Sequence, residues 1–186
     1  MKKFYTMKIA GIERDLELFP ISDKLKIAAF IMFGDVEITK ACAAELLKKV
    51  PEHDIMITAE SKGIPLLYEM ARQENASNYI VARKKEKVYM KNVIHTDVQS
   101  ITTVGGQDLC IGENDINAMK GKKVLIVDDV ISTGGSLAAV ESLVNQAGGI
   151  IVGKVAVLAE GDAVDREDIT YLEKLPLFDS EGNPIL

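Results

Sequence analysis

Short apolar runs alternate with helix-like segments along most of the chain. Runs of this length predict buried strands, and they cover residues 55–59, 78–82, 123–128 and 150–159. Apolar residues at helical spacing predict helices over residues 35–50, 64–72, 114–120 and 137–147. Asp35 is placed to cap the first of these helices. Alternation of this kind is typical of a parallel sheet covered by helices on both sides, so we predict an α/β fold.

Three segments do not follow this alternation. Residues 1–34 and 160–186 fit it poorly, and we expect the two ends of the chain to form a small hood together. Residues 86–111 carry charges and then β-leaning stretches around Gly105 and Gly106, which predicts a flexible β-hairpin. A chain of 186 residues suits one core. We therefore predict a single domain over residues 1–186.

The most informative segment is residues 127–136, Val-Asp-Asp-Val-Ile-Ser-Thr-Gly-Gly-Ser. Two carboxylates, Asp128 and Asp129, follow an apolar strand, and a turn of small residues then leads into a helix. Such a turn presents backbone N–H groups to an anion at the positive end of a helix dipole. In open α/β sheets, ligands bind beyond the carboxyl ends of the strands. The segment therefore predicts a phosphate site beside two acceptors for sugar hydroxyls, which suits a ribose 5-phosphate.

Two simpler interpretations explain this segment less well. An ordinary turn between strand and helix accounts for the glycines, but not for two acids placed against an apolar strand end. A nucleotide-binding P-loop requires a Lys after its glycines, and Ser136 stands there instead.

Composition narrows the classes of function. The chain carries 22 basic and 28 acidic residues, for a net charge of −6, which argues against binding nucleic acid through its phosphates. Its apolar runs are too short to span a bilayer, and lysines near the N-terminus are not followed by an apolar signal segment. Cys42 and Cys110 have no metal-type spacing, and we expect both to be reduced core thiols. These features predict a cytoplasmic protein.

Residues 127–136 resemble the phosphoribosyl-pyrophosphate (PRPP) signature of the type I phosphoribosyltransferases, and the wider resemblance covers roughly residues 25–178. It implies that Asp128 and Asp129 are the catalytic acids and bind the ribose. It also implies that the following loop holds the 5′-phosphate of PRPP, through Ser132, Thr133, Gly134, Gly135 and Ser136.

A second loop follows the predicted strand 55–59 and consists of Glu60, Ser61, Lys62 and Gly63. Taken alone, this sequence favours a solvated turn with an ion pair. It resembles the pyrophosphate-binding loop of the adenine and xanthine phosphoribosyltransferases, in which a strained, often cis, peptide is usual. Beside the PRPP signature, the resemblance makes pyrophosphate binding the better interpretation.

A cluster of cations follows the predicted strand 78–82. Four cations in five residues are usually a solvated face, but guanidinium and ammonium groups also suit the charge of pyrophosphate. The segment resembles the Arg-Lys segment that holds pyrophosphate in the same enzymes. We expect Arg83, Lys84 and Lys87 to be pyrophosphate ligands, and Lys85 and Lys91 to be solvated.

In the same family, the position of residues 86–111 holds a lid that closes over PRPP. Tyr89, Ser100 and Thr102 are candidate contacts, although an exposed hairpin without a role also fits. Adenine enzymes commonly carry a Ser-x-Glu-Tyr-like element here, whereas residues 100–103 are Ser-Ile-Thr-Thr. Either another group handles the proton of the base, or the base is not adenine.

The base pocket is the least specific part of the prediction. Phe30 or Phe33 could stack on a flat heterocycle, but core packing explains each equally well. Residues 25–37 resemble the hood segment of xanthine enzymes, with Met32-Phe33 in place of its polar pair. Glu160 resembles the acid that closes the purine pocket, with a turn carboxylate as the alternative. Val130 completes the expected pocket.

The resemblance implies an enzyme that joins a purine to PRPP and releases pyrophosphate, with Mg²⁺ bound through PRPP and water rather than directly by the protein. Hypoxanthine–guanine enzymes usually have an Asp at the position of Ser132, so we expect adenine, giving AMP, with xanthine or another purine as the alternative. A non-catalytic PRPP-binding regulator is a further alternative. The family usually forms homodimers, and we expect one here.

Overall fold

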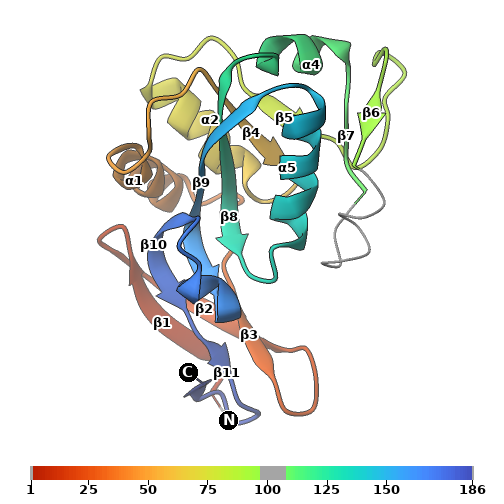
Figure 1. The fold of residues 1–186 in the computed structure, drawn as a ribbon. Helices are drawn as coiled ribbons and strands as arrows, with labels where there is room; N and C mark the ends of the chain where they lie inside the picture. Colours follow the sequence, from red (N-terminus) through yellow and green to blue (C-terminus); the bar gives the residue numbers. More distant parts are fainter. Residues whose placement is uncertain (1, 97–107, 186) are drawn as a thin grey trace.

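A five-stranded parallel sheet forms the centre of the molecule (Figure 1). The structure is a computed structural model that describes residues 2–96 and 108–185. In sheet order the strands are β10 (Thr170–Leu175), β9 (Ile150–Glu160), β8 (Lys123–Ile131), β4 (Ile55–Ala59) and β5 (Ile80–Ala82). The predicted α/β fold with a parallel sheet is confirmed, because four of these strands are the four apolar runs of the sequence.

Helices cover both faces of this sheet because successive side chains of a strand point to opposite faces. Leu125 and Val127 of β8 belong to a cluster with residues of α1 (Val36–Leu47) and α2 (Ile64–Gln73). Val124 and Ile126 of the same strand belong to a second cluster, with residues of α5 (Gly135–Gln146) and α4 (Glu113–Met119). All four predicted helices are therefore present.

The two ends of the chain form an antiparallel sheet, which we call the hood. Its strands, in order, are β1 (Phe4–Ile9), β2 (Ile12–Pro20), β3 (Lys26–Ala29), β11 (Leu177–Phe178) and β12 (Pro184–Ile185). Both termini lie beside it (Figure 1). The predicted hood built from both ends is therefore present.

The structure differs from the prediction at the C-terminal part of the hood. Strand β10 pairs in parallel with β9, from Thr170 beside Val155 to Leu175 beside Glu160, so residues 170–175 extend the central sheet. Only a short 3₁₀ helix, η1 (Gly161–Asp165), lies between these strands. The sequence did not reveal β10 because no helical segment precedes it and its residues are mostly half-exposed.

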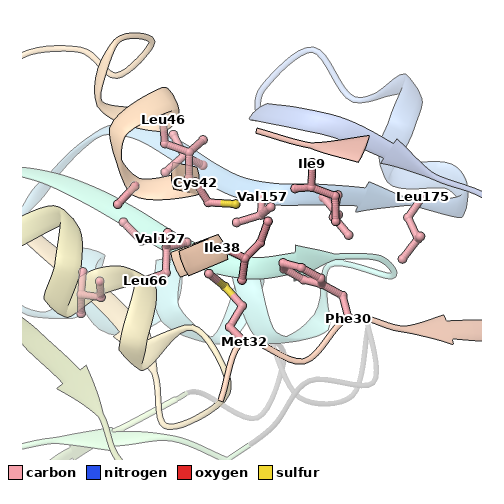
Figure 2. Packing of buried hydrophobic residues seen from close by; sticks show 14 of the residues in the cluster. Ile9, Phe30, Met32, Ile38, Cys42, Leu46, Leu66, Val127, Val157 and Leu175 are labelled. Atoms are coloured by element: carbon pink, nitrogen blue, oxygen red, sulfur yellow. The ribbon is translucent and has the colours of Figure 1, made fainter. Parts of the chain in front are cut away.

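Hood and central sheet share one hydrophobic cluster (Figure 2). Ile9 of β1 and Phe30, just after β3, lie in the same cluster as Val127 and Val157 of the central strands. Leu175 continues the cluster from the end of β10. The hood is thus held over the carboxyl ends of the central strands by buried apolar surface.

The segment predicted as a lid is described only at its base. Strand β6 (Ile94–His95) pairs antiparallel with β7 (Cys110–Ile111). Residues 97–107, with the candidate contacts Ser100 and Thr102, lie outside the described residues. Cys42 and Cys110 are both free and buried, as expected. Within the described ranges, every helix is too short or too polar to cross a membrane.

Candidate active site

The predicted site residues gather at one edge of the central sheet. Because β4, β5, β8 and β9 are parallel, their carboxyl ends meet at the same edge. Residues 60–63, 83–87 and 132–136, which were singled out from the sequence, follow β4, β5 and β8, and Glu160 is the last residue of β9. The topology thus brings together four segments that are far apart in the chain.

Asp128 and Asp129 form a buried pair at the centre of this edge. Asp128 is 8% exposed and Asp129 is 4% exposed. The backbone N–H of Asp129 donates to Oδ1 of Asp128 at 2.9 Å. Burial, followed by the negative charge of Asp129, raises the pKa of Asp128 well above its usual range. Two such carboxylates form a concentrated negative centre that favours a ligand with hydroxyl donors or developing positive charge.

Lys62 supplies the positive charge beside this pair. Its Nζ lies 3.1 Å from Asp129 Oδ2 and donates to the backbone carbonyl of Phe30 at 2.9 Å. The ammonium group therefore links the loop after β4 with both the acid pair and the hood segment. The sequence predicts that Lys62 binds pyrophosphate, which stays a prediction, and the structure places its ammonium group against Asp129.

Gly63 allows its loop to approach the acid pair. A Cβ atom at this position would lie 2.7 Å from Thr58 Oγ1 and 3.2 Å from Asp128 Oδ1, closer than ordinary contact. Thr58 is fully buried, and its hydroxyl has no hydrogen-bond partner among the described residues. Thr58 was not among the residues predicted from the sequence. The signal was present, because Thr58 is the one polar residue in the otherwise apolar run 55–59.

The turn from Ser132 to Ser136 joins β8 to α5. Gly134 caps the helix with φ +81°, a conformation that glycine adopts readily. A Cβ atom on Gly134 would also lie 2.7 Å from Nη1 of Arg166. Arg166 therefore lies against the turn, although the sequence analysis did not select it. No local pattern marks this residue, because it comes 32 positions after Gly134.

Glu60 links the two predicted pyrophosphate segments. It accepts a hydrogen bond from the backbone N–H of Lys84 at 2.9 Å and pairs with Arg83 Nη2 at 3.1 Å. The Lys84 hydrogen bond lowers the pKa of Glu60, and the charge of Arg83 adds to this effect. Glu60 thus stays ionised and is already bound to these two residues. It orients the Arg83 guanidinium group and fixes the backbone at Lys84.

Arg83 lies between Glu60 and the start of the predicted lid. Its Nη1 donates to the hydroxyl of Tyr89 at 3.4 Å, and its Nε is buried without a partner among the described residues. Lys87 lies at the same end of the strand, and its backbone N–H donates to the sulfur of Met90. The cations are gathered as predicted, and their binding of pyrophosphate stays a prediction.

Phe30 and Phe33 occupy different environments. Phe30 is 3% exposed and belongs to the shared core, whereas Phe33 is 57% exposed. Phe33 lines a surface pocket with Glu60, Ser61, Lys62, Ile64 and Lys84. Of the two rings, only that of Phe33 is accessible to a ligand in this structure.

Glu160 and Val130 lie on neighbouring strands. Val130 of β8 is half-buried and pairs with Leu158 of β9. Burial raises the pKa of Glu160, an effect that the charge of Lys62 partly offsets. Glu160 ends β9 at this edge of the sheet, and its part in a base pocket stays a prediction.

One expectation from the family resemblance is wrong for this structure. Every peptide bond among the described residues is trans, so the loop of residues 60–63 contains no cis peptide. Ser61 Oγ instead accepts from the backbone N–H of Gly63 at 3.4 Å. The loop closes on itself through the Ser61 side chain.

Comparisons with known proteins agree with this geometry. The model of the phosphoribosyl transferase domain family matches residues 35–179. A hypoxanthine/guanine phosphoribosyltransferase from Methanotorris igneus is 31% identical over 154 residues, 80% of this chain and 75% of the relative. An adenine phosphoribosyltransferase from Acetivibrio thermocellus is 35% identical over 151 residues, 76% of this chain and 81% of the relative.

Solved structures show the same fold. The adenine phosphoribosyltransferase of Thermoanaerobacter pseudethanolicus superimposes with a TM-score of 0.68 at 21% identity, covering 86% of this chain and 95% of that one. The predicted type I phosphoribosyltransferase fold is confirmed by this likeness, and the family match identifies an enzyme of the glycosyltransferase type. The chain belongs to the phosphoribosyl transferase domain family, in the purine branch that its sequence predicted.

Proposed function

We propose that this purine phosphoribosyltransferase transfers the phosphoribosyl group of PRPP to adenine, giving AMP and pyrophosphate. The observation that carries the proposal is the meeting of three features at one sheet edge. These are the buried acids Asp128 and Asp129, the turn of residues 132–136, and the ammonium group of Lys62, 3.1 Å from Asp129. A phosphorylated sugar with a charged leaving group matches all three.

In this proposal, the 5′-phosphate lies in the turn of residues 132–136. Backbone N–H groups at the start of α5, with the hydroxyls of Ser132, Thr133 and Ser136, donate to its oxygens. Asp128 and Asp129 accept from the ribose hydroxyls. Their charge also stabilises the positive charge that develops on the sugar as the bond to pyrophosphate breaks.

The pyrophosphate group lies toward Lys62, Arg83, Lys84 and Lys87. Glu60 holds the guanidinium group of Arg83 and the backbone N–H of Lys84, so the Arg83 donors are oriented before the ligand arrives. Preorganised cations stabilise the leaving group without reorganisation during the reaction. In this proposal, the hood covers the side of the site opposite the pyrophosphate. The purine base then lies toward Phe33 and Glu160.

A divalent cation fits this site as a companion of PRPP. No three Asp, Glu, His or Cys side chains in residues 2–96 and 108–185 come together to hold a metal ion. Mg²⁺ keeps several oxygen ligands from water and phosphate when a protein offers few. If it were bound with PRPP, it would neutralise part of the pyrophosphate charge, beside the positive charges of Lys62 and Arg83.

Two observations support adenine. Ser132 stands where hypoxanthine–guanine enzymes usually carry an Asp toward the base, and a hydroxyl cannot replace that carboxylate. The relative from Acetivibrio thermocellus, named for adenine, is 35% identical. A 6-oxopurine is the second candidate, because the relatives from Methanotorris igneus and Methanocella paludicola, named for hypoxanthine and guanine, are 31% and 30% identical.

A competition assay tests the proposal. The protein is incubated with PRPP, Mg²⁺ and equal concentrations of adenine, hypoxanthine, guanine and xanthine, and the nucleotides are separated by chromatography. We expect AMP as the main product. A main product of IMP, GMP or XMP would reassign the base within the same family, and no nucleotide at all would contradict the proposed reaction.

A further inference from the structure

Arg166 lies directly against the turn that the proposed function assigns to the 5′-phosphate. Its Nη1 is 2.7 Å from the position that a Cβ atom on Gly134 would occupy. The guanidinium group therefore fills the space next to the backbone of Gly134, where any other residue would place its side chain. It approaches the turn from the connection between η1 and β10.

Asp168 fixes the orientation of this guanidinium group. Arg166 Nε donates to Asp168 Oδ1 at 2.9 Å, and Nη2 donates to Oδ2 at 2.7 Å. This is the bidentate arrangement that the planar guanidinium favours. It uses the side of the group that faces away from Gly134, and Nη1 makes no hydrogen bond to any described residue.

The Arg166–Asp168 pair is itself anchored to the central sheet and to α5. Lys154 of β9 donates to Asp168 Oδ2 at 2.7 Å and also contacts Glu141 of α5. The hydrogen bonds from Arg166 and then Lys154 lower the pKa of Asp168. Two positive and two negative groups thus form a network that leaves one directed N–H donor at the turn.

We infer that Arg166 is a further ligand of the 5′-phosphate, with Nη1 donating to a phosphate oxygen while Asp168 holds the other edge of the guanidinium group. The inference rests on the proposed function. In residues 132–136, the donors are backbone N–H groups and hydroxyls without full charge. Arg166 adds the missing full positive charge, so it favours a phosphate dianion over a neutral sugar hydroxymethyl group.

The test compares two ligands that occupy different halves of the site. Binding of ribose 5-phosphate and of magnesium pyrophosphate is measured by titration calorimetry for the wild type and for Arg166→Gln. We expect affinity for ribose 5-phosphate to fall roughly tenfold to a hundredfold, because a hydrogen bond to a charged group is lost. Affinity for magnesium pyrophosphate should change less than about twofold, in keeping with near-neutral substitutions away from a contact.

A matched control is Arg72→Gln. Arg72 makes the same bidentate pair with Glu69, at 2.8 and 2.7 Å, on α2 and outside the site. This variant should bind both ligands as the wild type does. If Arg166→Gln does not fold, Arg166→Lys carries the same test, because it keeps the charge but loses the bidentate pair; a selective loss for ribose 5-phosphate is again expected.

Two results would overturn the inference and leave the proposed function standing: unchanged binding of ribose 5-phosphate by the variant, or an equal loss for both ligands. A wild-type protein that binds neither PRPP nor ribose 5-phosphate would instead contradict the proposed function itself. The two failures are therefore distinguishable.

Discussion

At the scale of single residues, the site combines groups that do not favour stability. Asp128 and Asp129 are buried side by side, and burial of a charge costs free energy unless it is fully compensated. Lys62 compensates one of them directly, through Asp129. The fold therefore contains a buried negative centre that does not stabilise its core. We expect this centre to serve ligand binding instead.

Replacing Asp128 by Asn should separate stability from activity. The folded-state pKa of Asp128 is raised, so its contribution to stability is greatest below the ordinary pKa of about 3.9 and is lost as pH rises through the folded value. At neutral pH, Asp128→Asn removes this cost and keeps an oxygen for the Asp129 N–H. We expect the free energy of unfolding in urea to rise by about 1 kcal/mol, while turnover falls at least roughly a hundredfold.

Asp35→Asn is the control of opposite sign. Arg14 lowers the pKa of Asp35 through a bidentate ion pair. Asn caps a helix about as well as Asp, so Asp35→Asn loses mainly the charge of this pair and should lower the free energy of unfolding by up to about 1 kcal/mol. A less stable Asp128→Asn variant would contradict the account of the acid pair.

Gly63→Ala tests the close approach of the loop to β8. The new methyl group would lie 2.7 Å from Thr58 Oγ1, on a fixed strand, so we expect a loss of about 1–3 kcal/mol from overpacking. Thr58→Ala in the same chain should recover part of this loss by removing the hydroxyl. Gly112→Ala is the control, since its nearest atom would be 3.5 Å away. Equal stabilities of Gly63→Ala and Gly112→Ala would argue against the packing described.

At the scale of elements, a histidine joins the two ends of the predicted lid. His95 of β6 pairs with Glu86 at 2.8 Å and with Asp108 at 3.4 Å. The Glu86 hydrogen bond, with help from Asp108, raises the pKa of His95 above 6.5. Because the folded pKa is raised, the stabilisation is complete below the ordinary pKa and is lost as pH rises through the folded value.

Hydrogen exchange should therefore report a hairpin base that opens more readily at higher pH. After correction for intrinsic exchange rates, we expect protection of the Cys110 amide, which donates to the carbonyl of Arg83, to fall as pH rises above the ordinary histidine pKa of about 6.5. His95→Gln should remove this dependence. Equal pH dependence in the wild type and the variant would show that another group is responsible.

Sequence patterns predicted the elements whose burial is uniform. Strand β4 is apolar except for Thr58, β8 begins with the apolar run 124–127, and α1 follows a capping Asp35. β1, β2 and β10 were not predicted as strands, because each is exposed on one face and its register depends on neighbours distant in sequence. The acids, the glycine turn and the cations followed from local motifs. The packing of Thr58 against Gly63 and of Arg166 against Gly134 needed the tertiary structure.

At the scale of the whole molecule, hood and central sheet depend on one core. Phe178 of β11 is fully buried in the cluster that contains Val127 and Val157, and it packs edge-on against Tyr5 at 4.9 Å. A hood with this much shared surface should not unfold independently. The single domain over residues 1–186 stays a prediction, which unfolding of a core variant can test.

Phe178→Ala tests this coupling. We expect a loss of about 3–5 kcal/mol from the cavity, with tyrosine fluorescence and circular dichroism following the same urea transition. Tyr68→Ala is the control, because that ring is half-exposed on α2. Two separate transitions in the wild type or the variant would show instead that the hood is a separate folding unit.

The most direct test of the central claim is phosphorus NMR of the reaction itself. With wild-type protein, PRPP, Mg²⁺ and adenine, we expect the PRPP signals to be replaced by those of pyrophosphate and AMP in equal amounts, and Asp128→Asn to leave PRPP unchanged over the same period. PRPP that stays intact with adenine, hypoxanthine, guanine and xanthine alike would contradict the assignment of this site to phosphoribosyl transfer.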